Sequence, residues 1–328
     1  MVSSLYEANI LNQPAEWKRL LSIPLPRDLN TIRPKKIVFI GIGSSYWVAR
    51  FAEFLWREHQ TKDTIYIEPL SVQSFDFVKS KYVVSDNEIV VVFSHRGTKT
   101  FSMQALEIAK KNYHATTILI TGIESPLNPN VDFRLETCTQ ENCGAFTISL
   151  SCAITRIIQW MGLSNKDFIE KFCKTINVIE KEIPYEIRLP RFPTNLVIVG
   201  DLIHEVVAHE VALKISETFY LPVRSFGLEE FLHGPRVTLD KSSSLLIFSS
   251  LLEPRRKTLI DYAKIVGSEV ISIDEERFMN VPKEFRWLAQ LLWGQLLASE
   301  LSKEFKTNPD TLRADQHVYK EAKNHLTL

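Results

Sequence analysis

The sequence predicts an α/β protein with two doubly wound parallel sheets in tandem. Short apolar segments alternate with segments of helical periodicity, which is typical of a parallel sheet with crossover helices. The alternation stops near Ile183-Pro184 and then starts again, so the 328 residues read as a weak internal duplication. We therefore expect a first domain at residues 1–183 and a second domain at residues 184–328.

Four apolar segments define the first predicted sheet. Each is close to a continuous apolar run, as expected for a strand that is buried on both faces. One or two helices are expected before Pro34, others at residues 44–59 and about 100–112, and an interrupted pair at about 146–181. The predicted strands are KIVFIGI (36–42), TIYIEPL (64–70), EIVVVFS (88–94) and TTILIT (116–121).

The second half repeats the pattern. Its helices are expected at residues 204–219, about 254–266 and about 283–304. The last stretch, residues 308–328, is polar and is expected to wrap onto the body of the protein. The predicted strands are NLVIVG (195–200), PVRSF (222–226), SSLLIFSS (243–250) and EVISID (269–274).

Charge and apolar content exclude several classes of protein. Lys plus Arg and Asp plus Glu are both 39, so the net charge is zero, which argues against nucleic acid as the main partner. No apolar run approaches the roughly 20 residues needed to span a bilayer, so we expect no membrane association. The N-terminus lacks the pattern of a signal peptide. A cytoplasmic protein is expected.

The cysteine pattern agrees with a reducing compartment. Cys138, Cys143, Cys152 and Cys173 form no C-x-x-C pair. Cys138 and Cys143 are close enough in sequence to bond, but buried free thiols are the preferred interpretation.

A first loop with the character of an anion site follows the first strand. In GIGSSY, Gly41 and Gly43 allow a tight turn, and Ser44 and Ser45 stand where the next helix begins. Free N–H groups at helix N-termini attract anions. The loop is no dinucleotide fingerprint, because Tyr46 occupies the third glycine position. A glycine turn with a serine cap is the structural alternative.

A second such loop, SHRGTKT, follows the strand at residues 88–94. It gathers the hydroxyls of Ser94 and Thr98 and the cations Arg96 and Lys99 at a helix start. Taken alone it could be a solvated turn, but two such loops on buried strands favour a phosphate site. The matching loops of the second half read DLIHE and LLEPRR, so we expect one phosphate site per chain.

A cluster of titratable residues lies in the second half. Glu210, Lys214 and Glu217 are spaced i, i+4 and i+7 and therefore share a helix face. The structural alternative is an exposed salt-bridge stripe, worth about 0.3–0.5 kcal/mol per pair. Further on, Gly234-Pro235 ends any helix and is expected to place His233 on a loop.

No metal site or cofactor is expected. His204 and His209 are five residues apart, so they do not share one helix face as the two ligands of a zincin motif do. We interpret both as ordinary helix residues.

The order of these motifs resembles the double SIS (sugar isomerase) domain family. The likeness extends to the isomerase half of glucosamine-6-phosphate synthase and to stand-alone glucosamine-6-phosphate deaminases, and it implies flavodoxin-like domains. It covers most of the chain and is specific where the family shows E-G-A-L-K-x-K-E and then E-L-x-H-G-P. The matching residues are Glu210, Ala212, Leu213, Lys214, Glu217, Glu230, His233, Gly234 and Pro235.

The resemblance implies a role for each residue. A sugar phosphate would be held by Ser45 and the loop of residues 94–100. His233 would open the sugar ring, and Glu217 would carry a proton between C1 and C2 through an enediol or enolamine. A buried carboxylate and a histidine suit these roles near neutral pH. Lys214 would stabilise negative charge or hold Glu217.

Two further implications concern the C-terminus and assembly. A lysine near the C-terminus reaches the open sugar in this family, and Lys323 is the candidate, with Lys320 as a rival. The histidine loop often comes from the neighbouring subunit, which implies a homodimer.

The sequence also departs from the family pattern. The phosphate loop usually reads Ser-Gln/Arg-Ser-Gly-Glu/Thr-Thr, and here Arg96 replaces one hydroxyl and Lys99 another. A Thr-Lys-Ala-Phe-Thr segment is reduced to CGAFT at residues 143–147. The chain begins Met1-Val2 without a glutaminase domain, so glutamine-dependent amination is not expected unless a partner chain supplies ammonia.

The favoured function is therefore a phosphosugar isomerase that deaminates glucosamine 6-phosphate to fructose 6-phosphate and ammonia. Isomerisation of a hexose phosphate without deamination is the first alternative. The second is a non-catalytic sugar-phosphate sensor, which would need the phosphate loops but neither Glu217 nor His233. Such a sensor often carries a DNA-binding helix-turn-helix, for which the residues before Pro34 leave no room.

Overall fold

The structure, a computed structural model, describes residues 4–32, 34–60, 66–80, 82, 84–85, 87–191, 195–251 and 253–326. It divides into two compact units, each built around one parallel sheet. The first-sheet unit consists of Asn12–Glu141 and Phe146–Glu170. The second-sheet unit consists of Lys171–His325, Asn142–Ala145 and the chain up to Leu11. The domain division predicted between residues 183 and 184 stays a prediction.

The first sheet has five parallel strands in the order β2-β1-β3-β4-β5. The strand order reverses between β1 and β3, and ligands of such sheets bind beyond the C-terminal ends of the strands at this point. The sheet therefore presents the loops after β1 and β3 side by side. The strands are β1 (Lys36–Gly41), β2 (Glu68–Gln73), β3 (Glu88–Phe93), β4 (Thr116–Thr121) and β5 (Phe133–Glu136).

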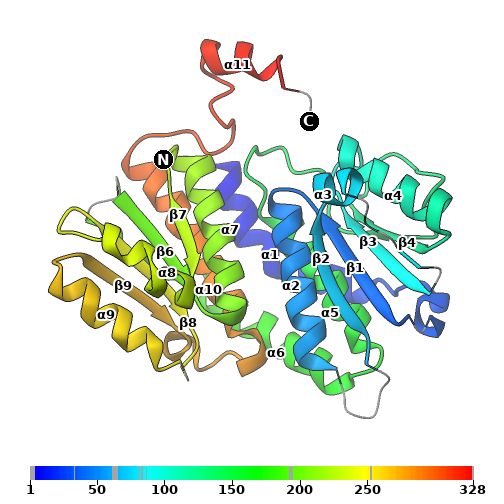
Figure 1. Cartoon of the computed structure of the whole chain (residues 1–328), viewed down its shortest axis with the longest axis horizontal. Coiled ribbons are helices and arrows are strands. Elements are labelled where there is room, and N and C mark those ends of the chain that lie inside the picture. Colours follow the sequence, from blue (N-terminus) through cyan, green and yellow to red (C-terminus); the bar gives the residue numbers. More distant parts are fainter. Residues whose placement is uncertain are drawn as a thin grey trace. The chain divides into compact units, whose positions relative to one another are not determined.

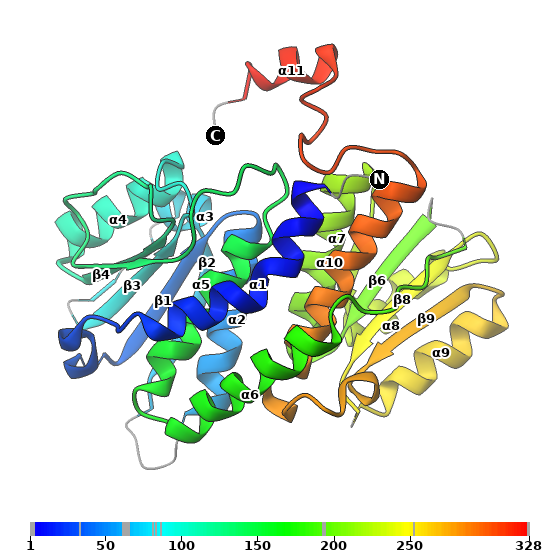
Figure 2. The same cartoon turned by 180° about the vertical axis from the view of Figure 1, so that it is seen from behind.

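Helices cover both faces of this sheet, as predicted (Figures 1 and 2). On one face α2 (Ser44–His59) and α5 (Ile148–Gly162) contact each other. There Phe39 of β1 packs against Trp56 of α2, and Trp56 packs edge-on against Trp160 of α5. The other face carries α3 (Ser74–Lys79) and α4 (Thr100–Tyr113).

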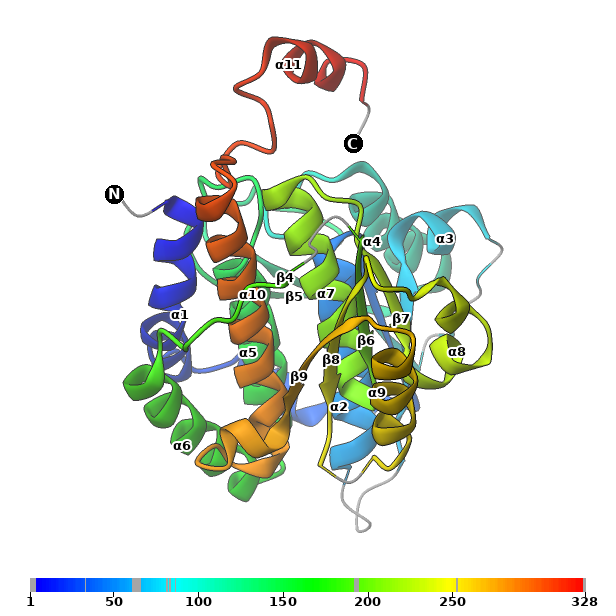
Figure 3. The ribbon, with the colours of Figure 1, turned by 90° about the vertical axis from the view of Figure 1, so that its left-hand side faces the viewer.

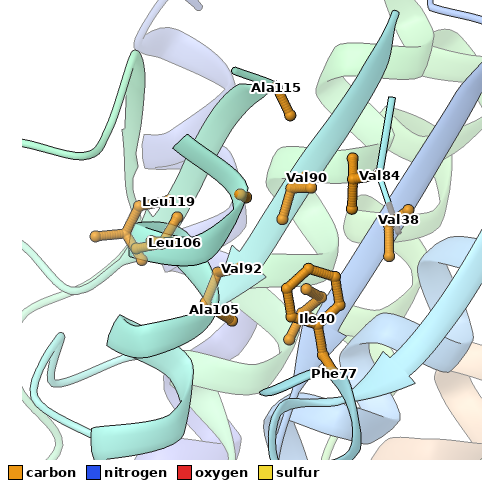
Figure 4. Packing of buried hydrophobic residues seen from close by; sticks show 11 residues of the cluster. Val38, Ile40, Phe77, Val84, Val90, Val92, Ala105, Leu106, Ala115 and Leu119 are labelled. Carbon is orange, nitrogen blue, oxygen red and sulfur yellow. The ribbon is translucent and has the colours of Figure 1, made fainter. Parts of the chain in front are cut away.

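The face under α3 and α4 holds a cluster of fully buried side chains (Figure 4). Val38 and Ile40 point to this face while Phe39 points to the other, which is the alternation of a strand with two buried faces. Full burial of one such side chain contributes about 1.5–3 kcal/mol. The strands, and with them the loops at their ends, are therefore held from both sides. The strand residues Val38, Ile40, Val90, Val92 and Leu119 meet Phe77, Ala105 and Leu106 of the helices.

The second sheet has four parallel strands in the order β7-β6-β8-β9. Helices α7 (Leu202–Phe219) and α10 (Arg286–Glu304) lie on one side, and α8 (Leu228–His233) and α9 (Arg255–Ile265) lie on the other (Figure 3). Counted within each half, its strand order equals that of the first four strands of the first sheet, which supports the predicted duplication. The strands are β6 (Leu196–Gly200), β7 (Arg224–Gly227), β8 (Ser244–Ser249) and β9 (Glu269–Asp274).

Two further long helices are α1 (Leu5–Ser22), near the N-terminus, and α6 (Lys166–Glu182), after α5. Most predicted elements are confirmed to within two residues. The strand predicted at residues 64–70 is observed as Glu68–Gln73, and Thr64 and Ile65 lie outside the described residues. The short edge strand β5 and helices α3 and α11 (His317–Lys323) were not predicted.

The C-terminal stretch follows the prediction only in its first part. Asp310 accepts hydrogen bonds from the backbone N–H groups of Leu5 and Tyr6, and the guanidinium of Arg313 lies 4.3 Å from the ring centre of Tyr220. From Asp315 to Leu326 every described residue is exposed, and α11 stands apart (Figure 1). The expectation that the whole stretch wraps onto the body is therefore wrong.

Cysteine burial and hydropathy were also predicted. Cys138, Cys143 and Cys152 are buried free thiols, as expected, but Cys173 is exposed. Within the described part of the chain, no helix combines the length and the apolar character that a bilayer crossing requires.

Candidate functional site

A pocket opens in the first-sheet unit at the C-terminal ends of β1, β3 and β4. It brings together the two loops that the sequence singles out, because their strands are neighbours in the sheet. Its free space is about 20 Å³, which suits one or two water-sized groups, so a sugar phosphate needs some side chains to move. The lining residues are Ser44, Ser45, Val48, Phe93, Ser94, His95, Ile120, Thr137, Phe146, Ser149, Leu150 and Ala153.

The first wall is the start of α2, a helix of 16 residues. Gly43 stands before it with φ 57°, a left-handed conformation that glycine adopts without strain. A Cβ atom at Gly41 would lie 2.1 Å from the carbonyl oxygen of Ser45, so only glycine lets the helix start this close to the strand. The half-buried Ser44 and Ser45 thus line the pocket at the positive end of the helix dipole.

The second wall is the Ser94 side chain. Ser94 is 4% exposed, and its hydroxyl is buried with no hydrogen-bond partner among the described residues. Its carbonyl oxygen is occupied by Thr121 Oγ1 (2.6 Å) and by the N–H of Gly97 (3.0 Å). A buried hydroxyl without a partner costs roughly 1–3 kcal/mol, a cost that a bound polar group would remove.

The other predicted phosphate residues are outside the pocket lining. Arg96 is exposed, and its guanidinium lies 5.3 Å from the ring centre of Phe146, which does line the pocket. Thr98 is exposed, and Lys99 is the residue before α4. Arg96 therefore stands at the rim, from which its long side chain can reach an anion.

His95 is one of the pocket residues that sequence reasoning missed. The backbone N–H of Glu141 donates to its Nε2 atom (3.1 Å). Burial, and then the neighbouring Arg96, lower the pKa of His95 to about 4, so the ring is neutral at physiological pH. The signal available in the sequence was its position, because His95 is the second residue of the loop SHRGTKT, which was already predicted to bind an anion.

Helix α5 contributes further lining residues that were not predicted. Its first turn carries Ser149, and the buried carboxylate of Glu141 accepts hydrogen bonds from the N–H of Thr147 (2.8 Å) and from Ser149 Oγ (2.6 Å). A carboxylate at a helix N-terminus is a favourable cap. The acidic residue six positions before Thr-x-Ser was the signal that could have identified this cap.

The second-sheet unit carries the predicted proton-transfer residues on α7. Lys214 and Glu210 are both 0% exposed, and Lys214 Nζ lies 2.5 Å from Glu217 Oε2 and 3.5 Å from Glu210 Oε1. The Glu217 side chain is 26% exposed. The alternative of an exposed salt-bridge stripe is therefore wrong. A buried charge needs such partners, because losing one leaves an uncompensated ion.

Burial of this ion cluster follows from close packing of α7 on α10. A Cβ atom at Gly294 of α10 would lie 2.2 Å from a methyl group of Val211. Glycine at this position lets the two helices approach, and Thr218 Oγ1 donates to the carbonyl of Ala298 across the contact (3.5 Å).

His233 is the last residue of α8 and not a loop residue, which corrects the expectation from Gly234-Pro235. The helix ends directly before Gly234-Pro235. The His233 side chain is 78% exposed, and Nε2 lies 3.2 Å from Glu229 Oε2 on the same helix. Lys320 and Lys323 lie on α11 and are exposed.

The matching edge of the second sheet is filled by its own side chains. Asp201 accepts the backbone N–H of Ser250 after β8 (3.2 Å). His204 lies 3.4 Å from Glu275 and hydrogen-bonds Gln290. At this edge of the sheet a backbone N–H group is therefore already hydrogen-bonded to a carboxylate of the protein itself. Among the described residues no group of three or more His, Cys, Asp or Glu side chains is placed to hold a metal.

Comparison with known proteins relates the chain to a family. The model of the SIS domain matches residues 32–158, a range that contains both pocket loops and most of α5. Glutamine–fructose-6-phosphate aminotransferase (isomerizing) of Thermococcus kodakarensis is 22% identical over 309 residues, which are 85% of this chain and 51% of that protein. The chain thus spans about half the length of this relative.

Solved structures share the fold. The C-terminal domain of glucosamine-fructose-6-phosphate aminotransferase from Francisella tularensis superposes with a TM-score of 0.77 at 16% identity, covering 94% of this chain and 98% of that one. Glucosamine-6-phosphate deaminase from Thermotoga maritima gives 0.74 at 21% identity, covering 94% and 97%. Tagatose-6-phosphate ketose/aldose isomerase from Escherichia coli gives 0.73 at 18% identity, covering 94% and 95%.

Proposed function

Residues 32–158 match the SIS domain, and on this premise we propose that the chain is an enzyme, a phosphosugar aldose–ketose isomerase. The observation that carries the proposal is the pocket where the α2 N-terminus meets the buried Ser94 hydroxyl, which has no partner among the described residues. A phosphate oxygen would accept a hydrogen bond from that hydroxyl. The helix dipole would favour the negative charge.

Phosphate binding is assigned to six residues. The hydroxyls of Ser44, Ser45 and Ser94 would contact the anion within the pocket. Arg96 and Lys99 would add charge-assisted hydrogen bonds, which are roughly twice as strong as neutral ones, and Thr98 would add a hydroxyl. The family has a hydroxyl residue at the position of Arg96, and these contacts would maintain the affinity for phosphate without it.

Proton transfer is assigned to Glu217. Its partner Lys214 holds one carboxylate oxygen at 2.5 Å, and the 26% exposure leaves the group within reach of a substrate. Glu217 would take the proton from C2 of an aldose and return it to C1 through an enediol or enolamine. Lys214 would orient Glu217 and stabilise developing negative charge.

Ring opening is assigned to His233 and sugar contact to Lys323. An exposed imidazole can move a proton between the ring oxygen and the anomeric hydroxyl, because histidine titrates near neutral pH. Glu229, 3.2 Å from Nε2, would steady the ring. Lys323 lies on the exposed α11 and would reach the open sugar.

The favoured reaction is glucosamine 6-phosphate plus water to fructose 6-phosphate plus ammonia. Moving the C2 proton to C1 leaves an imine at C2, and water then replaces the nitrogen. The likeness to the Thermotoga maritima deaminase, which covers 97% of that chain, supports this version. Hexose-phosphate isomerisation without deamination is the alternative, supported by the likeness to the tagatose-6-phosphate isomerase. A sugar-phosphate sensor is the non-catalytic alternative.

We propose the assembly as well. The equal strand orders of the two sheets support two SIS domains in tandem, at residues 1–183 and 184–328. The 78% exposure of His233 leaves this side chain accessible to a second copy of the chain, which supports a homodimer.

Purified protein mixed with glucosamine 6-phosphate tests the reaction. Ammonia and fructose 6-phosphate should appear in equal amounts. Conversion of a hexose phosphate without ammonia would replace deamination by isomerisation. Binding of both sugar phosphates without turnover of either would overturn the enzyme and favour the sensor.

A further inference from the structure

The loop after β4 packs against the loop that carries the predicted phosphate residues. We call them the β4 loop (residues 122–126) and the phosphate loop (residues 94–100). The N–H of Gly122 donates to the carbonyl of His95 (2.9 Å). A Cβ atom at Gly122 would lie 2.8 Å from that carbonyl oxygen, so a larger residue would force the two backbones apart. The β4 loop thus supports the phosphate loop at His95.

A second contact lies at Gly97, which closes the turn that begins with Ser94. The N–H of Gly97 donates to the Ser94 carbonyl (3.0 Å), and Gly97 has φ 64°, a left-handed conformation that suits glycine. A Cβ atom at Gly97 would lie 2.8 Å from Ser125 Cβ and 3.4 Å from Pro126 Cδ. The position of the β4 loop therefore limits where Gly97 can lie, and with it the turn that carries the Ser94 hydroxyl.

Arg134, on the edge strand β5, holds the β4 loop in turn. Its side chain is only 19% exposed. Nη2 donates to the carbonyls of Gly122 (3.3 Å) and Ile123 (3.0 Å), and Nη1 donates to the carbonyl of Pro126 (3.3 Å). A guanidinium presents its donors in a rigid planar fork, whereas the ammonium group of a lysine is a compact point charge. One side chain therefore fixes three carbonyl groups of a single short loop.

The charge of Arg134 is paired on its own strand. Nε donates to Glu136 Oε1 (3.0 Å). Arg134 is also outside the pocket lining. It differs in this way from Arg96, whose guanidinium lies 5.3 Å from the ring centre of the pocket residue Phe146. Any effect of Arg134 on a ligand in the pocket must therefore pass through the two loops.

We propose that Arg134 is a positioning residue of the phosphate site, which holds the β4 loop against His95 and Gly97 and so keeps the phosphate loop in its binding conformation. The proposal rests on the proposed function, since it takes the pocket to be the phosphate site. A loop that is fixed in advance loses little conformational freedom when the ligand binds, and this raises affinity. Without the guanidinium, both loops would have to be ordered by the ligand.

Binding of inorganic phosphate to the full chain by calorimetry tests the proposal. Arg134→Met keeps a long side chain but removes every donor, and it should bind about tenfold more weakly because the ligand must then order the loops. Arg134→Lys keeps the charge without the fork and should remain about fivefold or more weaker than wild type. A lysine variant that binds like wild type would show that only charge matters and would overturn the proposal.

Two control variants separate positioning from ion pairing and from stability. Glu136→Gln removes the ion pair of Arg134 but leaves the three carbonyl contacts, and it should bind phosphate like wild type. Arg57→Met removes an ion pair with Glu53 at the C-terminal end of α2. It should lower the midpoint of thermal unfolding without weakening phosphate binding. If Arg57→Met loses as much affinity as Arg134→Met, the effect is general instability and the proposal is rejected.

Steady-state kinetics give a second measurement. In Arg134→Met the KM for glucosamine 6-phosphate should rise by about tenfold while kcat stays within about twofold of wild type, because the phosphate is bound equally in the ground state and the transition state. A lower kcat at an unchanged KM would contradict a role in positioning the phosphate loop.

Amide hydrogen exchange of the wild-type protein tests the fixed loops even where a variant fails to fold. The β4 loop and the phosphate loop should exchange slowly without ligand, and added phosphate should change their exchange little. In Arg134→Met both loops should exchange faster, and phosphate should restore their protection. Wild-type loops that exchange fast until phosphate is added would overturn the proposal.

The failure of this proposal and that of the proposed function give different results. If the variants bind phosphate as described but wild type turns over no sugar phosphate, the enzyme is rejected and the role of Arg134 is confirmed. If wild type is active and Arg134→Met keeps its KM and its phosphate affinity, the role of Arg134 is rejected and the enzyme is not. A wild-type protein that binds neither phosphate nor a sugar phosphate would overturn both.

Discussion

At the scale of single residues, the proposed chemistry depends on where ionisable groups are buried. Lys214 has no exposed surface and lies between Glu210 and Glu217, so its charge is held by two carboxylates. Of the two, only Glu217 has exposed side-chain surface. A proton carrier needs this combination of a fixed position and access to a substrate.

Replacing Glu217 by Gln should remove the proton carrier while preserving its shape. We expect kcat to fall by about 10²–10⁴-fold with little change in KM, because a positioned acid–base group contributes that much. Steady-state kinetics on glucosamine 6-phosphate and on fructose 6-phosphate measure the loss. Glu107→Gln, which removes a carboxylate from an exposed ion pair on α4, is the control. A folded Glu217→Gln enzyme with full turnover would end the proton-carrier hypothesis.

His233→Ala should separate ring opening from proton transfer. Fructose 6-phosphate is closed in solution, whereas 5-deoxyfructose 6-phosphate lacks the hydroxyl that closes the furanose ring. We expect kcat/KM for the first to fall by about 10²-fold or more and that for the second to change little. Equal losses on both substrates would contradict the ring-opening role.

At the scale of elements, the start of α5 organises the pocket. The Glu141 carboxylate bonds Thr147 and Ser149, and its backbone N–H holds His95, so one residue connects the helix to the phosphate loop. The capping carboxylate also complements the helix dipole.

Glu141→Gln should therefore affect stability and binding together. The amide presents an N–H₂ group where two backbone N–H groups need acceptors. We expect the free energy of unfolding to fall by about 1–2 kcal/mol, measured by urea denaturation. Phosphate affinity should fall too, because Ser149 lines the pocket. Glu136→Gln, at an exposed surface pair, is the control. Unchanged unfolding would show that the cap contributes nothing.

The elements also show what the sequence could predict. Strand β4, which is buried on both faces, was predicted to the residue, since a continuous apolar run allows little else. The edge strand β5 has one neighbour and a mixed sequence, FRLE, and was missed. Ser44, Ser45 and Ser94 follow apolar strands and were predicted from that position, and all three line the pocket.

Features that depend on distant residues could not be predicted. The hydrogen bond that holds the His95 ring comes from Glu141, which lies 46 residues further along the chain. Burial of Lys214 depends on α10, whose Gly294 allows close approach to α7. Spacing alone shows that Glu210 and Lys214 share a face, but not that this face is covered.

At the scale of the whole molecule, the two sheets have the same strand order but differ in the groups at the C-terminal ends of their strands. In the first-sheet unit a buried hydroxyl is without a partner among the described residues, while in the second-sheet unit Asp201 occupies the N–H of Ser250. This difference supports one phosphate site per chain. The central claim is that this protein moves a carbon-bound proton on a bound sugar phosphate.

Hydrogen exchange in heavy water tests that claim most directly, whatever the substituent at C2. Fructose 6-phosphate is incubated with the protein in D₂O, and the two C1 hydrogens are followed by proton NMR. We expect wild type to exchange one of the two, because one carboxylate acts from one face, and Glu217→Gln to exchange neither. If wild type binds fructose 6-phosphate but leaves both hydrogens in place, the protein is no isomerase and the claim is contradicted.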